Sequence, residues 1–167
     1  MAIRTILTKG DPALNKMCYP VTKFDQKLWE LLDDLKETLA KANGLGLAAP
    51  QVGILRRAVI VVNDDGEMLE LVNPEIVDQK GEQDGLEGCL SVPGLWGYVK
   101  RPAWVKVKAQ DRDGNWFEVE GQELTARCFC HELSHLDGHL YTELTDKLYT
   151  NEDLDQMMSE EEQEERG

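Results

Sequence analysis

The segment H-E-L-S-H at residues 131–135 has the residue types and the spacing of a catalytic metal site. Residues four apart lie on one face of an α-helix, so the imidazoles of His131 and His135 can bind one metal ion. Glu132 follows the first histidine and can reach a water molecule at that ion. Two imidazoles do not complete such a site, because a catalytic metal needs a third protein ligand and an open fourth position. The motif therefore predicts metal-assisted hydrolysis with one ligand still to be found.

Three residues could supply the third ligand. Glu143 and His139 lie downstream, as the third ligand does in H-E-x-x-H peptidases, but Gly138 should end the helix before His139. Cys89 lies in the segment G-C-L-S, where a glycine lets the backbone approach a ligand closely. Taken alone, Cys89 is better explained as a small buried thiol. The residues by themselves leave these alternatives open.

A third segment of interest is G-L-G-L-A-A-P-Q-V-G at residues 44–53. It lacks the lysine and the hydroxyl residue of a phosphate-binding loop, and it lacks the glycine spacing of a dinucleotide fingerprint. It predicts a tight turn after the first helix. The amide of Gln51, its one polar side chain, can hydrogen-bond a substrate carbonyl or serve as a structural bridge.

Together these segments resemble the motifs of peptide deformylase. That family carries G-x-G-x-A-A-x-Q, E-G-C-[LM]-S and H-E-x-D-H in this order, and here they stand at residues 44–51, 87–91 and 131–135. The resemblance extends over about residues 3–149, through G-D-P near the N-terminus and V-P-G after the cysteine motif. Three motifs in register make the match specific.

The resemblance implies removal of the formyl group from the N-terminal formyl-methionine of new polypeptides, with release of formate. Cys89, His131 and His135 would bind one divalent metal, most often Fe(II) in the cell, with Ni, Co or Zn tolerated. One thiolate and two imidazoles are a borderline-soft set that suits these metals and not Mg or Ca. Glu132 would accept the water proton and return it to the leaving nitrogen.

The resemblance also assigns the remaining catalytic and substrate-binding groups. The Gln51 amide and the backbone N–H of Leu90 would stabilise the oxyanion. The Gly46 backbone would hold the formamide, and Arg101 would contact the peptide, although Arg101 considered alone is an ordinary surface charge.

The methionine pocket is expected beside the metal helix. Leu124 and Cys128 precede His131 by seven and three residues and share its helix face. Arg127 is expected to point away or to extend its charge into solvent.

Three positions depart from the family pattern: Leu86 precedes the cysteine motif, Cys130 replaces the usual Gln, and Ser134 replaces the Asp of H-E-x-D-H. None removes a ligand or the catalytic acid. A carboxylate near a metal orients its neighbours, so Ser134→Asp is expected to raise metal retention or thermal stability. An unchanged melting temperature and metal content would contradict this expectation.

Several elements must position these residues. A first helix is expected from the cap Asp25 to a stop at Gly44, with leucines along one stripe. Strands are expected at residues 57–62, 68–72, 104–108 and 116–120, the last two joined by a hairpin at Asp113-Gly114. The glycines at residues 85–97 suggest an irregular loop. A second helix is expected at about residues 122–137 and a third near Thr145.

This order predicts an α+β fold, a single domain with antiparallel sheets packed around a central metal-binding helix. Residues 1–150 would form the catalytic domain and residues 151–167 an acidic C-terminal tail or helix extension. The tail holds eight acidic residues and one arginine, so its net charge of −7 is half of the chain's −14. A solvated helix is the expected form of such a tail, and a partner-binding segment is the alternative.

Composition narrows the functional classes. The chain has 167 residues, 41% of them hydrophobic, which suits one globular domain with a core. With 32 acidic and 18 basic residues, direct DNA binding is not expected. No membrane span and no export signal are expected, so the cysteines are expected to be reduced. The formyl-methionine substrate that the resemblance implies points to a bacterial cytoplasmic enzyme. Its partners would be N-formyl-methionyl nascent peptides near the ribosomal exit. A zinc peptidase and a non-catalytic acidic binding domain are the alternatives.

Overall fold

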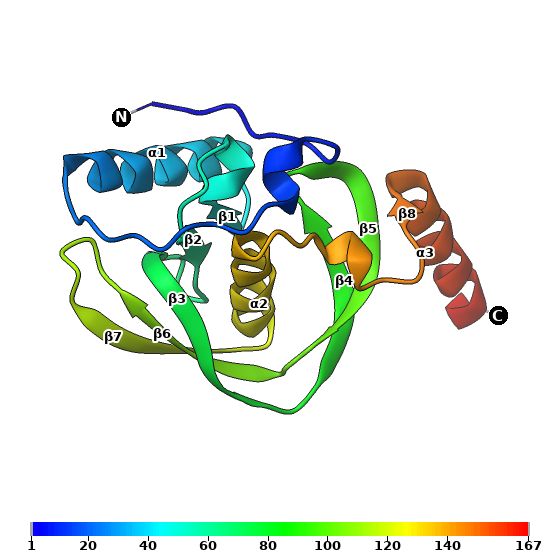
Figure 1. Cartoon of the computed structure of the whole chain (residues 1–167). Helices are drawn as coiled ribbons and strands as arrows, with labels where there is room; N and C mark the ends of the chain where they lie inside the picture. The colour runs from blue at the N-terminus through cyan, green and yellow to red at the C-terminus, as the bar shows by residue number, and fades with distance from the viewer. Residues whose placement is uncertain (1, 167) are drawn as a thin grey trace.

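Strand β2 (Ala58–Val62) separates two hydrophobic cores, because its side chains alternate between the two faces of a sheet. Ala58 and Ile60 pack with the leucines of helix α1 (Gln26–Ala42), whereas Val59 and Val61 pack with helix α2 (Leu124–Leu136). This computed structural model describes residues 2–166. Figure 1 shows α2 at the centre of the molecule and α1 along the upper edge.

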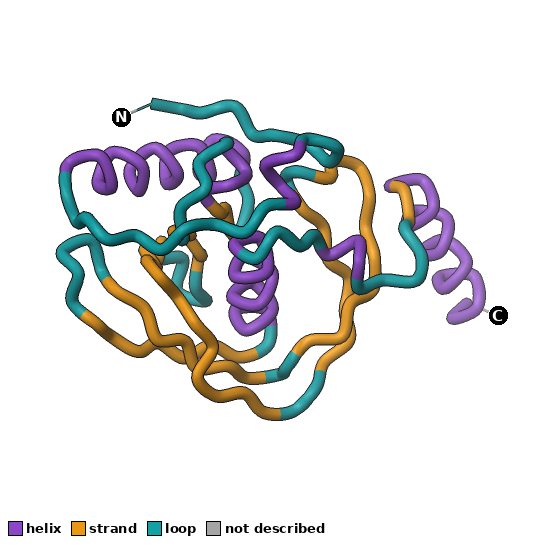
Figure 2. Tube along the Cα trace, viewed as in Figure 1, coloured by secondary structure: helices purple, strands orange, loops and turns teal. Residues whose placement is uncertain are grey.

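All strand pairs are antiparallel. The larger sheet has the order β1-β2-β3-β6-β7, and the smaller sheet has the order β4-β5-β8. Besides β2, the strands are β1 (Gly46–Ala48), β3 (Met68–Lys80), β4 (Gln83–Cys89), β5 (Val92–Arg101), β6 (Trp104–Gln110), β7 (Trp116–Gln122) and β8 (Tyr149–Thr150). Figure 2 shows the strands surrounding α2, so the prediction of an α+β fold with antiparallel sheets around a central helix is confirmed.

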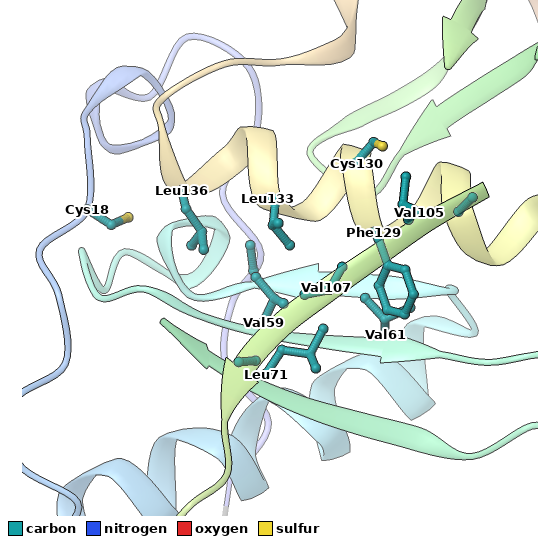
Figure 3. Packing of buried hydrophobic residues seen from close by; sticks show 13 residues of the cluster. Cys18, Val59, Val61, Leu71, Val105, Val107, Phe129, Cys130, Leu133 and Leu136 are labelled. Carbon is teal, nitrogen blue, oxygen red and sulfur yellow. The ribbon is translucent and has the colours of Figure 1, made fainter. Parts of the chain in front are cut away.

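Helix α2 is held in place by its apolar face. Phe129, Leu133 and Leu136 recur at helical spacing and pack against Val59 and Val107 of the larger sheet (Figure 3). Burying each such side chain stabilises the fold by about 1.5–3 kcal/mol. The opposite face of α2 is thereby directed toward the smaller sheet, which carries Glu87 and Cys89 of the cysteine motif.

The hairpin prediction at residues 113–114 is confirmed, since β6 and β7 pair from Trp104↔Gln122 to Gln110↔Trp116. The prediction of an irregular loop at residues 85–97 is wrong, because β4 and β5 form a hairpin there with one register shift between Glu87 and Cys89. Its glycines allow neighbouring side chains to lie directly on the strand. A Cβ atom at Gly85 would come 3.0 Å from the Arg127 guanidinium.

The helix boundaries differ slightly from the expected ones. Helix α1 is capped by Asp25 as expected, but its last residue is Ala42, and its C-cap is Asn43, which has a left-handed φ of 59° and lies one residue before the expected stop at Gly44. Helix α2 begins at Leu124, because Gln122 still belongs to β7.

Helix α3 (Asn151–Arg166) begins later than the expected position near Thr145. A 3₁₀ turn at Tyr141–Glu143 and the short strand β8 occupy the intervening chain. Within residues 2–166, no helix is long and apolar enough to span a membrane.

Candidate functional site

The metal-ligand candidates converge at the junction of α2 and β4. One donor atom from each of Cys89, His131 and His135 lies within 4.8 Å of the others. The Sγ atom of Cys89, at the end of β4, lies 3.4 Å from Nε2 of His135. Burial keeps the pKa of His135 well below its ordinary value, so this imidazole is neutral. Burial would also lower the pKa of His131, but hydrogen bonds with Cys89 and Glu87 raise it to about 10, so a metal ion would displace a proton from that ring. One thiol and two imidazoles fit a single divalent ion of borderline softness.

Glu132 lies in the same cluster with an unusual carboxylate. Its side chain is buried, and Oε2 has no hydrogen-bond partner among residues 2–166. Burial raises its pKa to about 7, and the charge of Glu87 adds to this effect, while His131 opposes it. The other oxygen, Oε1, lies 3.8 Å from His131 Nε2. A buried carboxylate with one unpaired oxygen carries a desolvation penalty, so it is a candidate for a proton-transfer role at neutral pH.

Gly46 of β1 lies directly against this carboxylate. A Cβ atom at Gly46 would come 2.7 Å from Cγ and 2.8 Å from Oε2 of Glu132. No side chain larger than hydrogen fits there without moving Glu132. The glycine of the first motif therefore brings its backbone next to the Glu132 carboxylate.

A buried carboxylate orients the first histidine of α2. Glu87 Oε1 lies 2.9 Å from His131 Nδ1, which leaves Nε2 of that ring for a metal. Arg101 donates to both oxygens of Glu87, at 2.8 and 2.9 Å, and Arg127 donates to Oε2 at 2.6 Å. Burial alone would raise the pKa of Glu87, but Arg101 and His131 lower it to about 2. This carboxylate is thus ionised at neutral pH.

The two arginines correct two expectations. Arg127 neither points away nor reaches solvent, because Glu87 and the carbonyl oxygen of Val99 accept hydrogen bonds from its buried guanidinium. Arg101 is buried as well, so it is not the ordinary surface charge that it suggests when considered alone. It is absent from the described residues that line the pocket, so its expected direct contact with peptide is not supported.

The amide of Gln51 is fixed at both ends. Its Oε1 accepts from the Ala48 backbone N–H at 2.9 Å, and its Nε2 donates to the Ser91 hydroxyl at 3.0 Å. The same Nε2 lies 3.7 Å from Cys89 Sγ. Gln51 and Ser91 are fully buried, so the orientation of the amide beside the metal-ligand cluster is well defined.

A pocket of about 500 Å³ opens beside this cluster. Its lining includes Gly46, Gln51, Leu90 and Glu132, and also Leu124 and Cys128, which were expected to border a methionine pocket. Leu124 is 52% exposed, so it lies at the mouth of the pocket. The lining is mostly apolar, as a site for a methionine side chain requires.

The alternative third ligands lie elsewhere. His139 Nδ1 is 3.3 Å from Glu143 Oε1, and both side chains are more than half exposed. Gly138 has a φ of 83° and follows the end of α2, so the helix stops before His139, as expected. Neither residue belongs to the cluster formed by Cys89, His131 and His135.

The departures from the motifs do not disturb this geometry. The Ser134 hydroxyl donates to the carbonyl oxygen of Cys130 within α2, at 2.9 Å. Cys18 and Cys130 are buried in the core between α2 and the larger sheet, with Cys128 packed beside it. The four cysteines are not joined by disulfide bonds.

Comparison with known proteins places this site in a family. A family model described as polypeptide deformylase matches residues 3–151. The chain belongs to the peptide deformylase family. A peptide deformylase of Agathobacter rectalis is 55% identical over 86% of this chain and 90% of its own length. One of Caldicellulosiruptor bescii is 51% identical over 95% of both chains. The crystal structure of a peptide deformylase from Legionella pneumophila superposes with a TM-score of 0.83, at 42% identity, over 95% of this chain and 92% of that chain.

Peptide deformylases are metal-dependent hydrolases that remove N-terminal formyl groups from nascent polypeptides, and this chain is an enzyme of that family. Sequence reasoning assigned no positioning role to Glu87, Ser91 or Arg127. One signal was available: Arg127 precedes His131 by one helical turn, so its side chain emerges next to that imidazole.

Proposed function

We propose that Cys89, His131 and His135 hold the divalent metal of this deformylase, and that the ion is Fe(II) in the cell. Zn, Ni or Co could replace it in purified protein, because the same ligand set suits all four. The convergence of the three donor atoms beside Glu132, whose Oε2 has no hydrogen-bond partner among residues 2–166, is the observation that carries the proposal. When bound, the ion supplies Lewis-acid activation of water and of the formyl carbonyl.

Glu132 acts as the general base and then as the general acid. It takes a proton from the attacking water and delivers that proton to the leaving amide nitrogen. Its burial supports this assignment, because a pKa near 7 lets one carboxyl group accept and release a proton at neutral pH. Gly46 allows the reacting formamide to approach, since its backbone carries no side chain toward Glu132.

Two donors stabilise the charge that develops on the formyl oxygen: the Nε2 amide of Gln51 and the backbone N–H of Leu90. The fixed orientation of Gln51 supports this role, because a preorganised donor needs no rearrangement as the charge forms. Leu124 and Cys128 border the methionine side chain. Arg101 acts through Glu87 and His131, as the ion pair with Glu87 suggests.

The substrate is a formyl-methionyl nascent peptide, met close to the ribosomal exit in a bacterial cytoplasm. Residues 1–150 form the catalytic domain, and residues 151–167 form an acidic extension outside the chemistry. The alternative of a peptidase with His139 or Glu143 as metal ligand has no support in the geometry, since these two side chains pair with each other at the surface.

The direct test is formate release from a formyl-Met tripeptide. The protein is prepared without oxygen and loaded with Fe(II) or Ni(II), because Fe(II) and a thiolate ligand both oxidise. Turnover that disappears on chelation and returns on reloading is the expected result. A folded, fully metallated sample without turnover would contradict the proposed activity.

A further inference from the structure

Trp96 of β5 forms part of the pocket wall and packs against Gly88 in β4, the strand that ends at Cys89. A Cβ atom at Gly88 would come 2.3 Å from Cζ3 and 2.5 Å from Cε3 of the Trp96 ring. Gly88 immediately precedes Cys89, and Trp96 lines the same pocket as Cys89 and Glu132. The indole therefore occupies the space that a side chain at Gly88 would need, on the strand that carries the proposed thiol ligand.

The other edge of this indole is held by the C-terminal helix. Trp96 Nε1 donates a hydrogen bond to Oδ1 of Asn151, the first residue of α3, at 2.8 Å. Immediately before that helix, β8 pairs with β5 through Leu95↔Thr150 and Trp96↔Tyr149. Main-chain pairing and a side-chain hydrogen bond thus join the start of α3 to Trp96, a pocket residue that lies on Gly88.

The start of α3 is itself well defined. The backbone N–H of Thr150 donates to Asp153 Oδ2 at 2.9 Å, and the backbone N–H of Asp153 donates to the Thr150 hydroxyl at 3.1 Å. This reciprocal pair is a capping box, which fixes the first turn of a helix. Asn151 lies inside that turn, so its amide is held at a fixed place relative to β5.

We propose that Asn151 is a positioning residue that orients Trp96 as a wall of the peptide-binding pocket, so that α3 contributes to substrate affinity. The inference rests on the proposed function, because it assigns bound formyl-methionyl peptide to this pocket. The indole packs against the peptide beside the reacting end. The acidic helix is therefore more than a solvated extension, because its first residue acts on the pocket through one hydrogen bond.

Steady-state kinetics with a formyl-Met tripeptide test this role on the full-length, metal-loaded enzyme. Asn151→Ala should raise KM about two- to tenfold, the range expected for loss of one hydrogen bond, and leave kcat unchanged. Asn151→Asp keeps an acceptor oxygen and should restore most of the affinity. Gln156→Ala is the matched control, because Gln156 is exposed on the same helix, and it should leave KM unchanged.

A second measurement does not depend on turnover. In protein labelled with ¹⁵N-tryptophan, the Trp96 indole N–H resonance should shift in Asn151→Ala and stay in place in Gln156→Ala. The same resonance should move when formyl-Met tripeptide is added to zinc-loaded Glu132→Gln protein.

Unchanged KM and an unchanged indole resonance in Asn151→Ala would overturn the inference. An equal rise of KM in Gln156→Ala would also overturn it. If the wild-type enzyme released no formate, the proposed function would fail, and the resonance shift in Asn151→Ala would still report whether Asn151 holds Trp96.

Discussion

The carboxylate of Glu87 lies 2.9 Å from Nδ1 of His131 and orients the ring of this proposed metal ligand. Two buried arginines hold the same carboxylate, so neither its rotamer nor its charge is free to change. The imidazole is thereby fixed with Nε2 toward Cys89 and His135. A histidine ligand fixed in this way loses little entropy when it binds a metal.

Replacing Glu87 should weaken metal binding even though Glu87 is not itself a ligand. We expect Glu87→Gln to lower affinity for Zn(II) about 10- to 100-fold, the usual effect of removing the partner of a ligating histidine. Competition with a chromogenic chelator measures this constant. Glu143→Gln is the control, because Glu143 is an exposed carboxylate that pairs with a histidine outside the cluster. Equal affinities in Glu87→Gln and wild type would contradict the orienting role.

Glu132→Gln should separate metal binding from chemistry. The substitution keeps the shape of the side chain but removes the carboxylate that we propose accepts and returns the proton. We expect metal content to match wild type and kcat to fall by at least about 100-fold. Metal analysis and formate release are measured on the same preparation. Retention of most of the turnover would show that another group carries the proton.

The close contact between Gly46 and Glu132 predicts a strong effect of one methyl group. In Gly46→Ala the new Cβ would stand 2.7 Å from Glu132 Cγ, so the carboxylate has to move. A displacement of about 1 Å at a catalytic group lowers the rate up to about 100-fold. Gly44→Ala is the comparison, because the nearest atoms to its Cβ would be the methyl groups of the flexible Leu90 and Leu39 side chains, at 2.9 and 3.0 Å. Similar kcat values in the two variants would contradict the steric argument.

Cys89→Ser distinguishes the proposed site from a peptidase-like one. The hydroxyl of serine is a poor ligand for a borderline-soft metal, so we expect most of the bound metal to be lost on dialysis. His139→Ala should retain as much bound metal as wild type, because His139 lies at the surface outside the cluster. The reverse pattern of metal contents would place the third ligand on the downstream segment.

The proposed metal ligands were easier to predict from the sequence than the buried residues that position them. His131 and His135 are four residues apart in one helix, so helical geometry alone places them on one face. Cys89 lies 42 residues before His131 in the chain, and only the resemblance to a family joined the two. Arginine side chains are usually exposed in proteins, so the sequence does not predict that Arg101 and Arg127 are buried. Their burial depends on an ion pair with Glu87, which is distant from both in the sequence.

The glycines at residues 85–97 show why the sequence predicted an irregular loop where the structure has a β-hairpin. Glycine is typical of loops, but it is also required where a side chain lies directly on a strand. At Gly88 that side chain is Trp96, and at Gly97 it is Thr145. Local sequence does not distinguish the two cases, because the neighbour that excludes a Cβ comes from another part of the chain.

A group of charges far from the active site predicts how stability changes with pH. Glu70 of β3 accepts from Arg112 Nε at 2.9 Å and pairs with Lys36 of α1 at 2.6 Å. Burial alone would raise the pKa of Glu70, but these two cations hold it below its ordinary value of 4.5. A carboxyl group with a lowered pKa in the folded state stabilises the fold above its unfolded pKa, and this contribution is lost as the pH falls through the folded value.

Glu70→Gln should therefore lower the melting temperature at pH 7 and flatten its decline on acidification below about pH 4.5. One charge-assisted hydrogen-bond partner is worth about 1–2 kcal/mol when it is mostly buried, which corresponds to a drop of about 2–8 °C in a chain of this size. Thermal melts from pH 7 to pH 3 measure both effects. Glu118→Gln is the control, because Glu118 is 56% exposed and its pair with Lys106 spans 3.7 Å, so it should change little. A group with equal pKa values in the folded and unfolded chains contributes no pH dependence to stability. If the melting temperatures of wild type and Glu70→Gln changed in parallel from pH 7 to pH 3, the pKa of Glu70 would be the same in both states, which would contradict this prediction.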